Sequence, residues 1–163
     1  EYLKEYKNID RLFYYNIENS LKEKSSEYRY NLYCNSLLSK VENGFIIFLD
    51  DDDCFTHNYV LNIISDNIKS QEDFLIWKYF RLDKLIYPQN LNNIKVGEID
   101  TTSFCFHSKY KNKSKWWDKQ YGDHNFVSKL LNSDIKFNIK FVNSILTKGD
   151  IDLNKLKIGN FGK

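Results

Sequence analysis

The sequence contains no methionine, a single proline and only three cysteines in 163 residues. Cys34, Cys54 and Cys105 are odd in number and none belongs to a CxxC pair, which excludes the usual zinc and dithiol redox motifs. We interpret them as reduced thiols, and this predicts a cytoplasmic protein. Because Met is missing even at position 1, we expect the sequence to begin inside a longer gene product.

The sequence also lacks a strong excess of charge and any long apolar run. The formal net charge is +2, and Lys and Arg are spread along the chain, so nucleic-acid binding is not implied. No apolar run approaches the roughly 18 residues of a membrane-spanning helix, and no signal-peptide pattern opens the chain. The sequence therefore predicts neither a nucleic-acid partner nor a membrane span.

Apolar residues make up 42% of the chain, which is enough for one core. Strand-like and helix-like segments alternate, and this order predicts an α/β domain with a mixed, mostly parallel sheet flanked by helices. We expect the domain to cover residues 1–146. Residues 147–163 have weak periodicity and are expected to form a loose tail.

Apolar spacing predicts the individual elements. Residues 28–41 have a helical stripe that ends before Asn43-Gly44, a second helix is expected after Thr56 as its N-cap, and a third at residues 123–131. The expected strands are residues 11–17, 45–49, 74–82, 99–107 and 135–142, and the expected loops are residues 83–98 and 110–119.

Residues 45–53, FIIFLDDDD, are the most informative stretch, because an apolar run ends there in four consecutive carboxylates. The run has the composition of a strand buried on both faces, and open α/β sheets bind ligands beyond the carboxyl ends of such strands. Adjacent carboxylates repel one another by about 1 kcal/mol or more per close pair. They need a counter-charge, and oxygen ligands favour Mg²⁺ or Mn²⁺.

Other acidic motifs can be compared with the same letters. An EF-hand loop counted from Asp50 needs Gly at its sixth position and Glu at its twelfth, where the sequence has Phe55 and Leu61, so this motif is excluded. A phosphatase of the haloacid-dehalogenase type, with Asp50 as nucleophile, needs Thr or Val where the sequence has Cys54. It remains an alternative, as does an ordinary acidic surface turn.

Four segments in order resemble the family 2 glycosyltransferases, whose nucleotide-sugar-binding α/β fold is called GT-A. They are residues 35–44 (NSLLSKVENG), 45–53, 97–104 (GEIDTTSF) and 122–126 (GDHNF), and they are similar to the family's helix–Gly–strand–DxD segment, its acceptor-side strand and its late acidic motif. Members of the family open with a strand–helix–strand unit that binds the nucleoside. Nothing here corresponds to that unit, so we expect a fragment that lacks it; a degenerate relative is the alternative.

The resemblance implies an inverting transfer of a sugar from a nucleotide-diphosphate donor, with a UDP-sugar as the first candidate, to a hydroxyl of a glycan, lipid or protein acceptor. Asp50 and Asp52 would be the ends of the DxD motif that holds Mn²⁺ or Mg²⁺ and the diphosphate. Asp53 would orient ribose or metal, and Asp51 would point away. A phosphohydrolase or a non-catalytic sugar- or metal-binding module are the alternative functions.

Asp123 is the expected catalytic base, because an inverting transfer needs a group that takes the proton from the acceptor hydroxyl. Gly122 occupies the place where the family usually has a further acid, so a single carboxylate would have to serve. The alternative role of Asp123 is an ordinary helix N-cap. Trp116 and Trp117 precede it and could stack on a sugar ring or pack in the core.

Four other side chains are candidates for smaller roles. Asp100 could hydrogen-bond the acceptor or only end a strand, and Asn35 could hold the donor side or be a satisfied polar residue of a helix. His107 and His124 could bind metal or position substrate, and their alternative is a surface or packing role.

Overall fold

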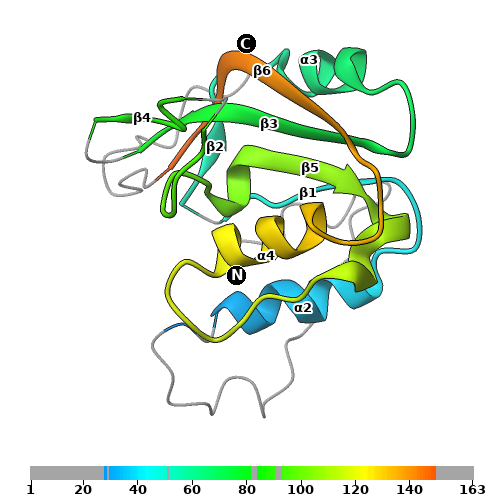
Figure 1. Ribbon diagram of the computed structural model, residues 1–163. Helices are drawn as coiled ribbons and strands as arrows, with labels where there is room; N and C mark the ends of the chain where they lie inside the picture. The colour runs from blue at the N-terminus through cyan, green and yellow to red at the C-terminus, as the bar shows by residue number, and fades with distance from the viewer. Residues whose placement is uncertain (1–27, 29, 51, 82–83, 91–92, 150–163) are drawn as a thin grey trace, which may run out of the picture.

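The structure is a computed structural model, and it describes residues 28, 30–50, 52–81, 84–90 and 93–149. The strand expected at residues 11–17 lies outside these ranges. Figure 1 shows the arrangement of the elements. Their bounds are α2 Tyr30–Lys40, β1 Phe45–Ile47, β2 Cys54–Phe55, α3 Val60–Asn67, β3 Asp73–Phe80, β4 Ile86–Tyr87, the 3₁₀ helix η2 Thr101–Ser103, β5 Phe104–His107, the 3₁₀ helix η3 Ser108–Lys113, α4 Gly122–Leu131 and β6 Asn138–Lys148.

The strands form one mixed sheet in the order β1-β5-β3-β6-β2, with β4 paired to β3. Among the described strands only β3 and β6 pair in parallel, while β5 is antiparallel to β1 and β3, and β2 to β6. The expected mostly parallel sheet is therefore wrong, because β5 is inserted in reverse between β1 and β3. Since β5 opposes both neighbours, β1, β3 and β6 still point the same way, and their carboxyl ends share one edge.

The alternation of side chains along β3 explains the layers of the fold. Phe74 and Ile76 pack in a core with side chains of α2 and α4, whereas Leu75 and Trp77 pack with side chains of α3 on the other face. All four are buried. Figure 1 shows the result, with α3 on one side of the sheet and α2 and α4 on the other. A strand covered on both faces has a near-continuous apolar sequence. This burial was predicted for residues 45–49, but in β1 only Ile46 is buried, and β3 is the strand that is buried on both faces.

The three predicted helices are all present, but α3 begins later than expected. Thr56 is not its N-cap, since the Thr56 backbone N–H donates to the carbonyl of Leu146 at 3.0 Å and its hydroxyl to that of Ile145 at 2.8 Å. α3 begins at Val60 without a side-chain cap. A Thr hydroxyl can bind a helix end or a neighbouring strand, and here it attaches the end of β2 to β6.

The last strand also differs from the prediction. β6 begins at Asn138 and continues to Lys148, so the first two residues of the expected tail belong to the sheet, and the rest beyond Gly149 lies outside the described residues. Ile139 and Phe141 pair with Phe74 and Ile76 of β3. They are nevertheless 46% and 40% exposed, although they alternate with Lys136, Asn138 and Lys140 in the pattern of a strand with only one face in water.

Candidate functional site

A pocket lies beyond the carboxyl ends of β1, β3 and β6, and we call it the acidic pocket. Its volume is about 230 Å³. The residues that line it come from six separate segments of the chain: Tyr30, Asp50, Asp52, Asp53, Tyr79, Arg81, Asp100, Thr101, Asp123 and Gly149. The structure therefore brings together every aspartate that the sequence analysis selected and that the structure describes. Asp51 lies outside the described residues.

Two residues separate the acidic stretch from the end of β1, which is shorter than the strand expected at residues 45–49, and the chain turns back at the acidic stretch. The backbone N–H of Asp53 donates to the carbonyl of Asp50 at 3.1 Å, and β2 then begins at Cys54 against the end of β6. Gly149 makes this approach possible, since a Cβ at that position would lie 2.9 Å from Oδ1 of Asp53. A side chain at position 149 would therefore displace the Asp53 carboxylate from the pocket.

The carboxylate of Asp123 is held by two neutral donors. The hydroxyl of Thr101 donates to Oδ1 at 2.5 Å, and Nε1 of Trp116 donates to the same oxygen at 3.0 Å. Asp123 is the second residue of α4, and the N-cap position belongs to Tyr121, so the N-cap role is excluded. A carboxylate in the first helical turn is still favoured by the helix dipole.

Asp100 is the N-cap of η2, and its side chain accepts hydrogen bonds from the backbone N–H and the hydroxyl of Thr102, both at 3.1 Å. The backbone N–H of Asp100 in turn donates to the hydroxyl of Ser103. Asp100 thus has the structural role that was one of its two expected roles, since it caps the start of η2. It also lines the acidic pocket.

Trp116 is a core residue and presents no face to a sugar. It is 2% exposed, and its ring stacks on Phe126 with centroids 3.5 Å apart. Trp117 is 44% exposed, and its ring is covered in part by Lys129, whose Nζ lies 3.7 Å from the ring centroid. Neither tryptophan lines the acidic pocket. The expected sugar contact of Trp116 is thus replaced by core packing and by its hydrogen bond to Asp123.

Two asparagines of α2 hold the segment that carries Asp123. The side-chain amide of Asn35 donates to the backbone carbonyl of Trp116 and accepts from the backbone N–H of Trp116, both at 2.9 Å. The amide therefore binds the backbone and not a nucleotide-sugar donor. Asn31 donates to the carbonyls of Trp117 and Lys119, each at 3.0 Å. The expected donor contact of Asn35 is therefore not what the structure shows.

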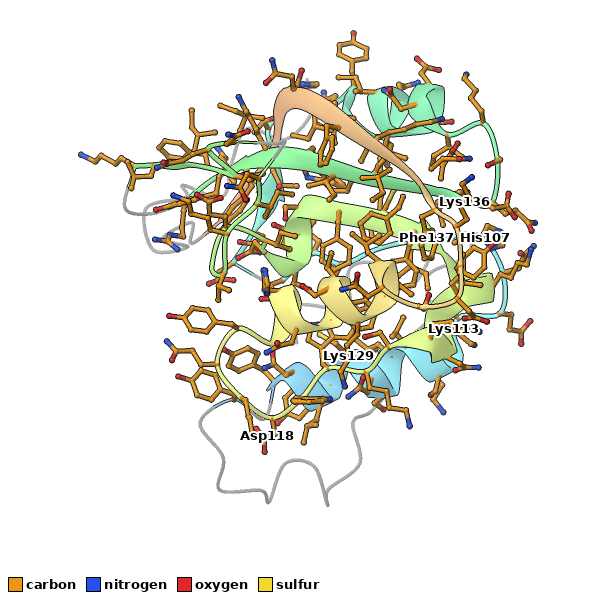
Figure 2. The ribbon with its side chains drawn as sticks, viewed as in Figure 1. His107, Lys113, Asp118, Lys129, Lys136 and Phe137 are labelled. Carbon is orange, nitrogen blue, oxygen red and sulfur yellow. The ribbon has the colours of Figure 1, made fainter. Side chains whose placement is uncertain are left out.

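The two histidines lie outside the acidic pocket. His107, labelled in Figure 2, is at the end of β5, at the opposite edge of the sheet, where Nδ1 accepts from the N–H of Lys109 and the ring packs edge-on against Phe45. His124 follows Asp123 on α4 but lines a different cavity, 3.4 Å from the hydroxyl of Ser128. His107 thus has the packing role given as its alternative, whereas His124 faces a cavity.

Sequence reasoning missed Thr101, Tyr79 and Arg81. Arg81 directly follows β3, and the acidic stretch is separated from β1 by two residues, so the rule about carboxyl ends could have found Arg81. Thr101 stands inside the segment GEIDTTSF, but nothing in the letters marks its hydroxyl as a partner of Asp123. Tyr79 belongs to an apolar strand, and nothing in the neighbouring sequence indicates that it lines a pocket.

Negative charge in the pocket affects its neighbours. Burial, followed by the charges of Asp50 and Asp123, raises the pKa of the Cys34 thiol to about 12. Burial, followed by the charge of Asp100, also raises the pKa of the Tyr79 phenol, which therefore remains a neutral donor at neutral pH. Arg81 is the cationic side chain among the lining residues, and it stands against five carboxylates.

The described residues include no group of three or more His, Cys, Asp or Glu side chains arranged to hold a metal ion. Mg²⁺ is usually bound through one or two carboxylates together with waters and substrate phosphates, so a site of this type does not need three protein ligands. Asp52 makes no hydrogen bond or ion pair within the described part of the chain, and it faces the pocket beside Asp50. These oxygen ligands fit a hard divalent cation.

No protein-family model matches the sequence, and no curated protein matches it either. In the part of the chain that the structure describes, no helix has the length and apolarity to cross a membrane. The assignment of a function therefore depends on the chemistry of the acidic pocket.

Proposed function

We propose that the protein is a metal-dependent inverting glycosyltransferase that uses the acidic pocket. The observation that supports this best is the convergence of Asp50, Asp52 and Asp123 on one pocket from segments far apart in the sequence. An acidic surface turn would explain the four consecutive aspartates but not the carboxylates from η2 and α4. The position beyond three strand ends is also where α/β sheets bind ligands.

The two ends of the pocket have different tasks in this proposal. Asp50, Asp52 and Asp53 lie on the donor side, where a bound Mn²⁺ or Mg²⁺ would neutralise the charge that develops on the departing diphosphate. Arg81 adds a fixed positive charge, and guanidinium groups suit phosphate oxygens. UDP-sugars are the donors to test first, by the resemblance of residues 45–53 to the DxD segment.

Asp123 is the base on the acceptor side. As the acceptor oxygen forms its bond to the anomeric carbon, Asp123 takes the hydroxyl proton, and the bond from that carbon to the donor phosphate breaks, so the nucleoside diphosphate leaves with the electron pair. Thr101 and Trp116 both bind Oδ1, and Oδ2 accepts no hydrogen bond within the described residues. Oδ2 is therefore the oxygen that receives the proton.

Calorimetric titration of UDP into the protein, with Mn²⁺ and then with EDTA, tests the donor site. We expect binding that requires the metal, and a loss of about tenfold or more in Asp52→Asn, which removes a ligand charge. Asp134→Asn is the matched control, since Asp134 is an exposed aspartate paired with Lys113 and is absent from the pocket. Equal binding of UDP in EDTA would refute the role of the metal, and no binding of UDP or of any other nucleoside diphosphate in either condition would refute the donor site.

Asp123→Asn tests the base. It should leave UDP affinity unchanged and reduce the rate of transfer by about 10² to 10⁴, the usual contribution of a general base. If Asp123→Asn abolishes both folding and UDP binding, Asp123 has a structural role. A phosphorylated aspartate trapped at Asp50 would indicate the phosphohydrolase, and donor binding with no transfer to any acceptor would indicate a binding module.

A further inference from the structure

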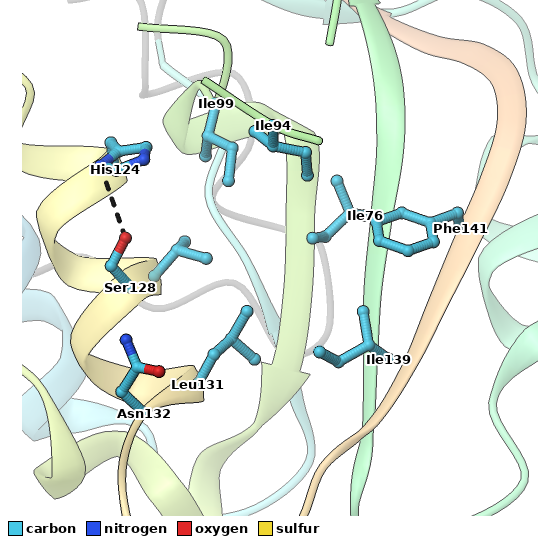
Figure 3. A pocket seen from close by; sticks show the side chains of 10 residues that line it. Ile76, Ile94, Ile99, His124, Ser128, Leu131, Asn132, Ile139 and Phe141 are labelled. Atoms are coloured by element: carbon cyan, nitrogen blue, oxygen red, sulfur yellow. Dashed lines mark hydrogen bonds between the residues drawn. The ribbon is translucent and has the colours of Figure 1, made fainter. Parts of the chain in front are cut away.

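A second cavity, which we call the apolar groove, lies between α4 and strands β3 and β6. Its volume is about 380 Å³, within the range of small-molecule sites. Ile76, Ile99 and Val127 form a buried aliphatic floor, and the partly exposed Ile139 and Phe141 form the outer wall. Figure 3 shows α4 on one side of the groove and the two strands on the other.

The helix side of the groove carries a polar row beside the apolar side chains of Val127 and Leu131. His124 and Ser128 of α4 and its C-cap Asn132 lie four residues apart, so they form one row along the groove, and Nδ1 of His124 is 3.4 Å from the hydroxyl of Ser128. Figure 3 shows this row facing Ile76, Ile139 and Phe141 across the opening. An apolar groove with a row of polar side chains along one side suits an amphiphilic ligand better than a purely apolar one.

One end of the groove lies near the acidic pocket, because two pairs of consecutive residues divide between the two cavities, although the cavities share no lining residue. His124 lines the groove and the preceding Asp123 lines the pocket; in the same way Ile99 lines the groove and Asp100 lines the pocket. Figure 3 shows His124 and Ile99 at the same end of the groove. A ligand that fills the groove would therefore extend its polar end toward Asp123.

We propose that the apolar groove binds the hydrocarbon part of the acceptor, which is an amphiphile with a hydroxylated head and an alkyl or isoprenoid chain. This inference rests on the proposed transfer, because it takes Asp123 as the base that the hydroxyl must reach. Ile139 and Phe141 contact the chain, and the row on α4 contacts the atoms next to the head. The acceptor class is thus specified by the groove and not by the acidic pocket.

Hexyl and octyl β-glucoside, each kept below its critical micelle concentration, are suitable probes. Titration is followed by amide chemical shifts of residues 124–132, without donor or metal. The affinity should rise roughly three- to fourfold per methylene, and so about tenfold from hexyl to octyl. Ile139→Glu places a charge on the apolar wall and should weaken the binding of octyl glucoside about tenfold. Leu61→Glu, at a position on α3 that is at least as exposed, should not.

Equal affinities for the two chain lengths, or equal losses in Ile139→Glu and Leu61→Glu, would overturn the inference. The UDP titration separates it from the proposed function. Metal-dependent UDP binding without glucoside binding would refute the acceptor site and leave the transferase intact. Binding of glucoside at the groove with no nucleotide binding would refute the role of the groove as an acceptor site.

Discussion

Gly122→Ala should destabilise the protein, although alanine is the better helix former. A Cβ on Gly122 would overlap Nδ2 of Asn31 and lie 2.8 Å from its Cγ. Asn31 is 3% exposed and holds the carbonyls of Trp117 and Lys119 at 3.0 Å each, so it cannot retreat without losing these bonds. The segment that it holds leads directly to Asp123. The contact between Gly122 and Asn31 therefore helps to fix the position of Asp123, the proposed base.

The magnitude follows from three contributions. Two lost hydrogen bonds cost about 1 kcal/mol each, and overpacking of a buried contact costs about 1 kcal/mol at the lower end of its range. Alanine in place of glycine in a helix restores at most about 1 kcal/mol. The free energy of unfolding should therefore fall by about 2 kcal/mol. An acid at position 122, which the family resemblance would favour, meets the same obstacle.

Urea denaturation followed by tryptophan fluorescence measures the change, and a double-mutant cycle identifies its cause. Asn31→Ala alone should also cost about 2 kcal/mol, for the same two hydrogen bonds. Asn31→Ala combined with Gly122→Ala should cost no more than Asn31→Ala, because the obstacle is gone. If Gly122→Ala is as stable as the wild type, or if the two costs simply add, the steric reasoning is refuted.

Two other substitutions test the packing around the site and the far edge of the sheet. Asp73 is 1% exposed and accepts from Nζ of Lys140 at 2.8 Å and from the N–H of Lys69 at 2.6 Å. Burial alone would raise its pKa, but these bonds hold the pKa well below its usual value. The stability that the Asp73 carboxylate contributes is complete above the ordinary pKa of Asp and is lost as the pH falls below that value. Asp73→Asn should therefore lower the free energy of unfolding by about 3 kcal/mol at pH 7, and in urea denaturation it should make stability depend less on pH below about pH 4. An unchanged pH dependence in this range would contradict the argument. Trp116→Phe keeps the stacking on Phe126 but removes the donor to Asp123. It should slow transfer with UDP affinity unchanged, and an unaltered rate would show that the bond has no part in positioning the base.

The position of the acidic pocket could be predicted from the sequence because it depends on strand direction. An apolar run followed by carboxylates identifies the end of β1, and ligands gather at such ends. The antiparallel insertion of β5 was not predicted, since short apolar runs carry no sign of their direction. The error did not move the site, because two reversals restore the common direction of β1, β3 and β6.

The partners of Asp123 could not be predicted, because they depend on packing between distant segments. A tryptophan seven residues before an aspartate has the same letters whether its ring faces solvent or Phe126. Asn35 likewise has the same polar letter whether it serves a ligand or the backbone of Trp116, and only the approach of α2 to that segment decides. Helix and strand patterns describe faces of single elements, and these contacts lie between elements.

Repulsion between the carboxylates of the acidic pocket should oppose folding. The direction in which Asp52→Asn changes the melting temperature therefore tests the role of the pocket. Five carboxylates and one guanidinium line a volume of about 230 Å³, and close pairs of like charge cost about 1 kcal/mol or more each. Asp52 makes no compensating hydrogen bond or ion pair within the described part of the chain. Asp52→Asn should therefore raise the melting temperature in EDTA, as expected where function maintains an unfavourable arrangement.

In Mn²⁺ the order should reverse. A cation at 100 times its dissociation constant stabilises the wild type by about 2.7 kcal/mol, and most of that gain is lost with the Asp52 carboxylate. Asp134→Asn should show no such reversal, because its carboxylate is exposed and paired with Lys113. A structural role for Asp52 predicts destabilisation under both conditions. The change of sign between EDTA and Mn²⁺ thus separates a cation site from a cluster of acids that only shapes the fold.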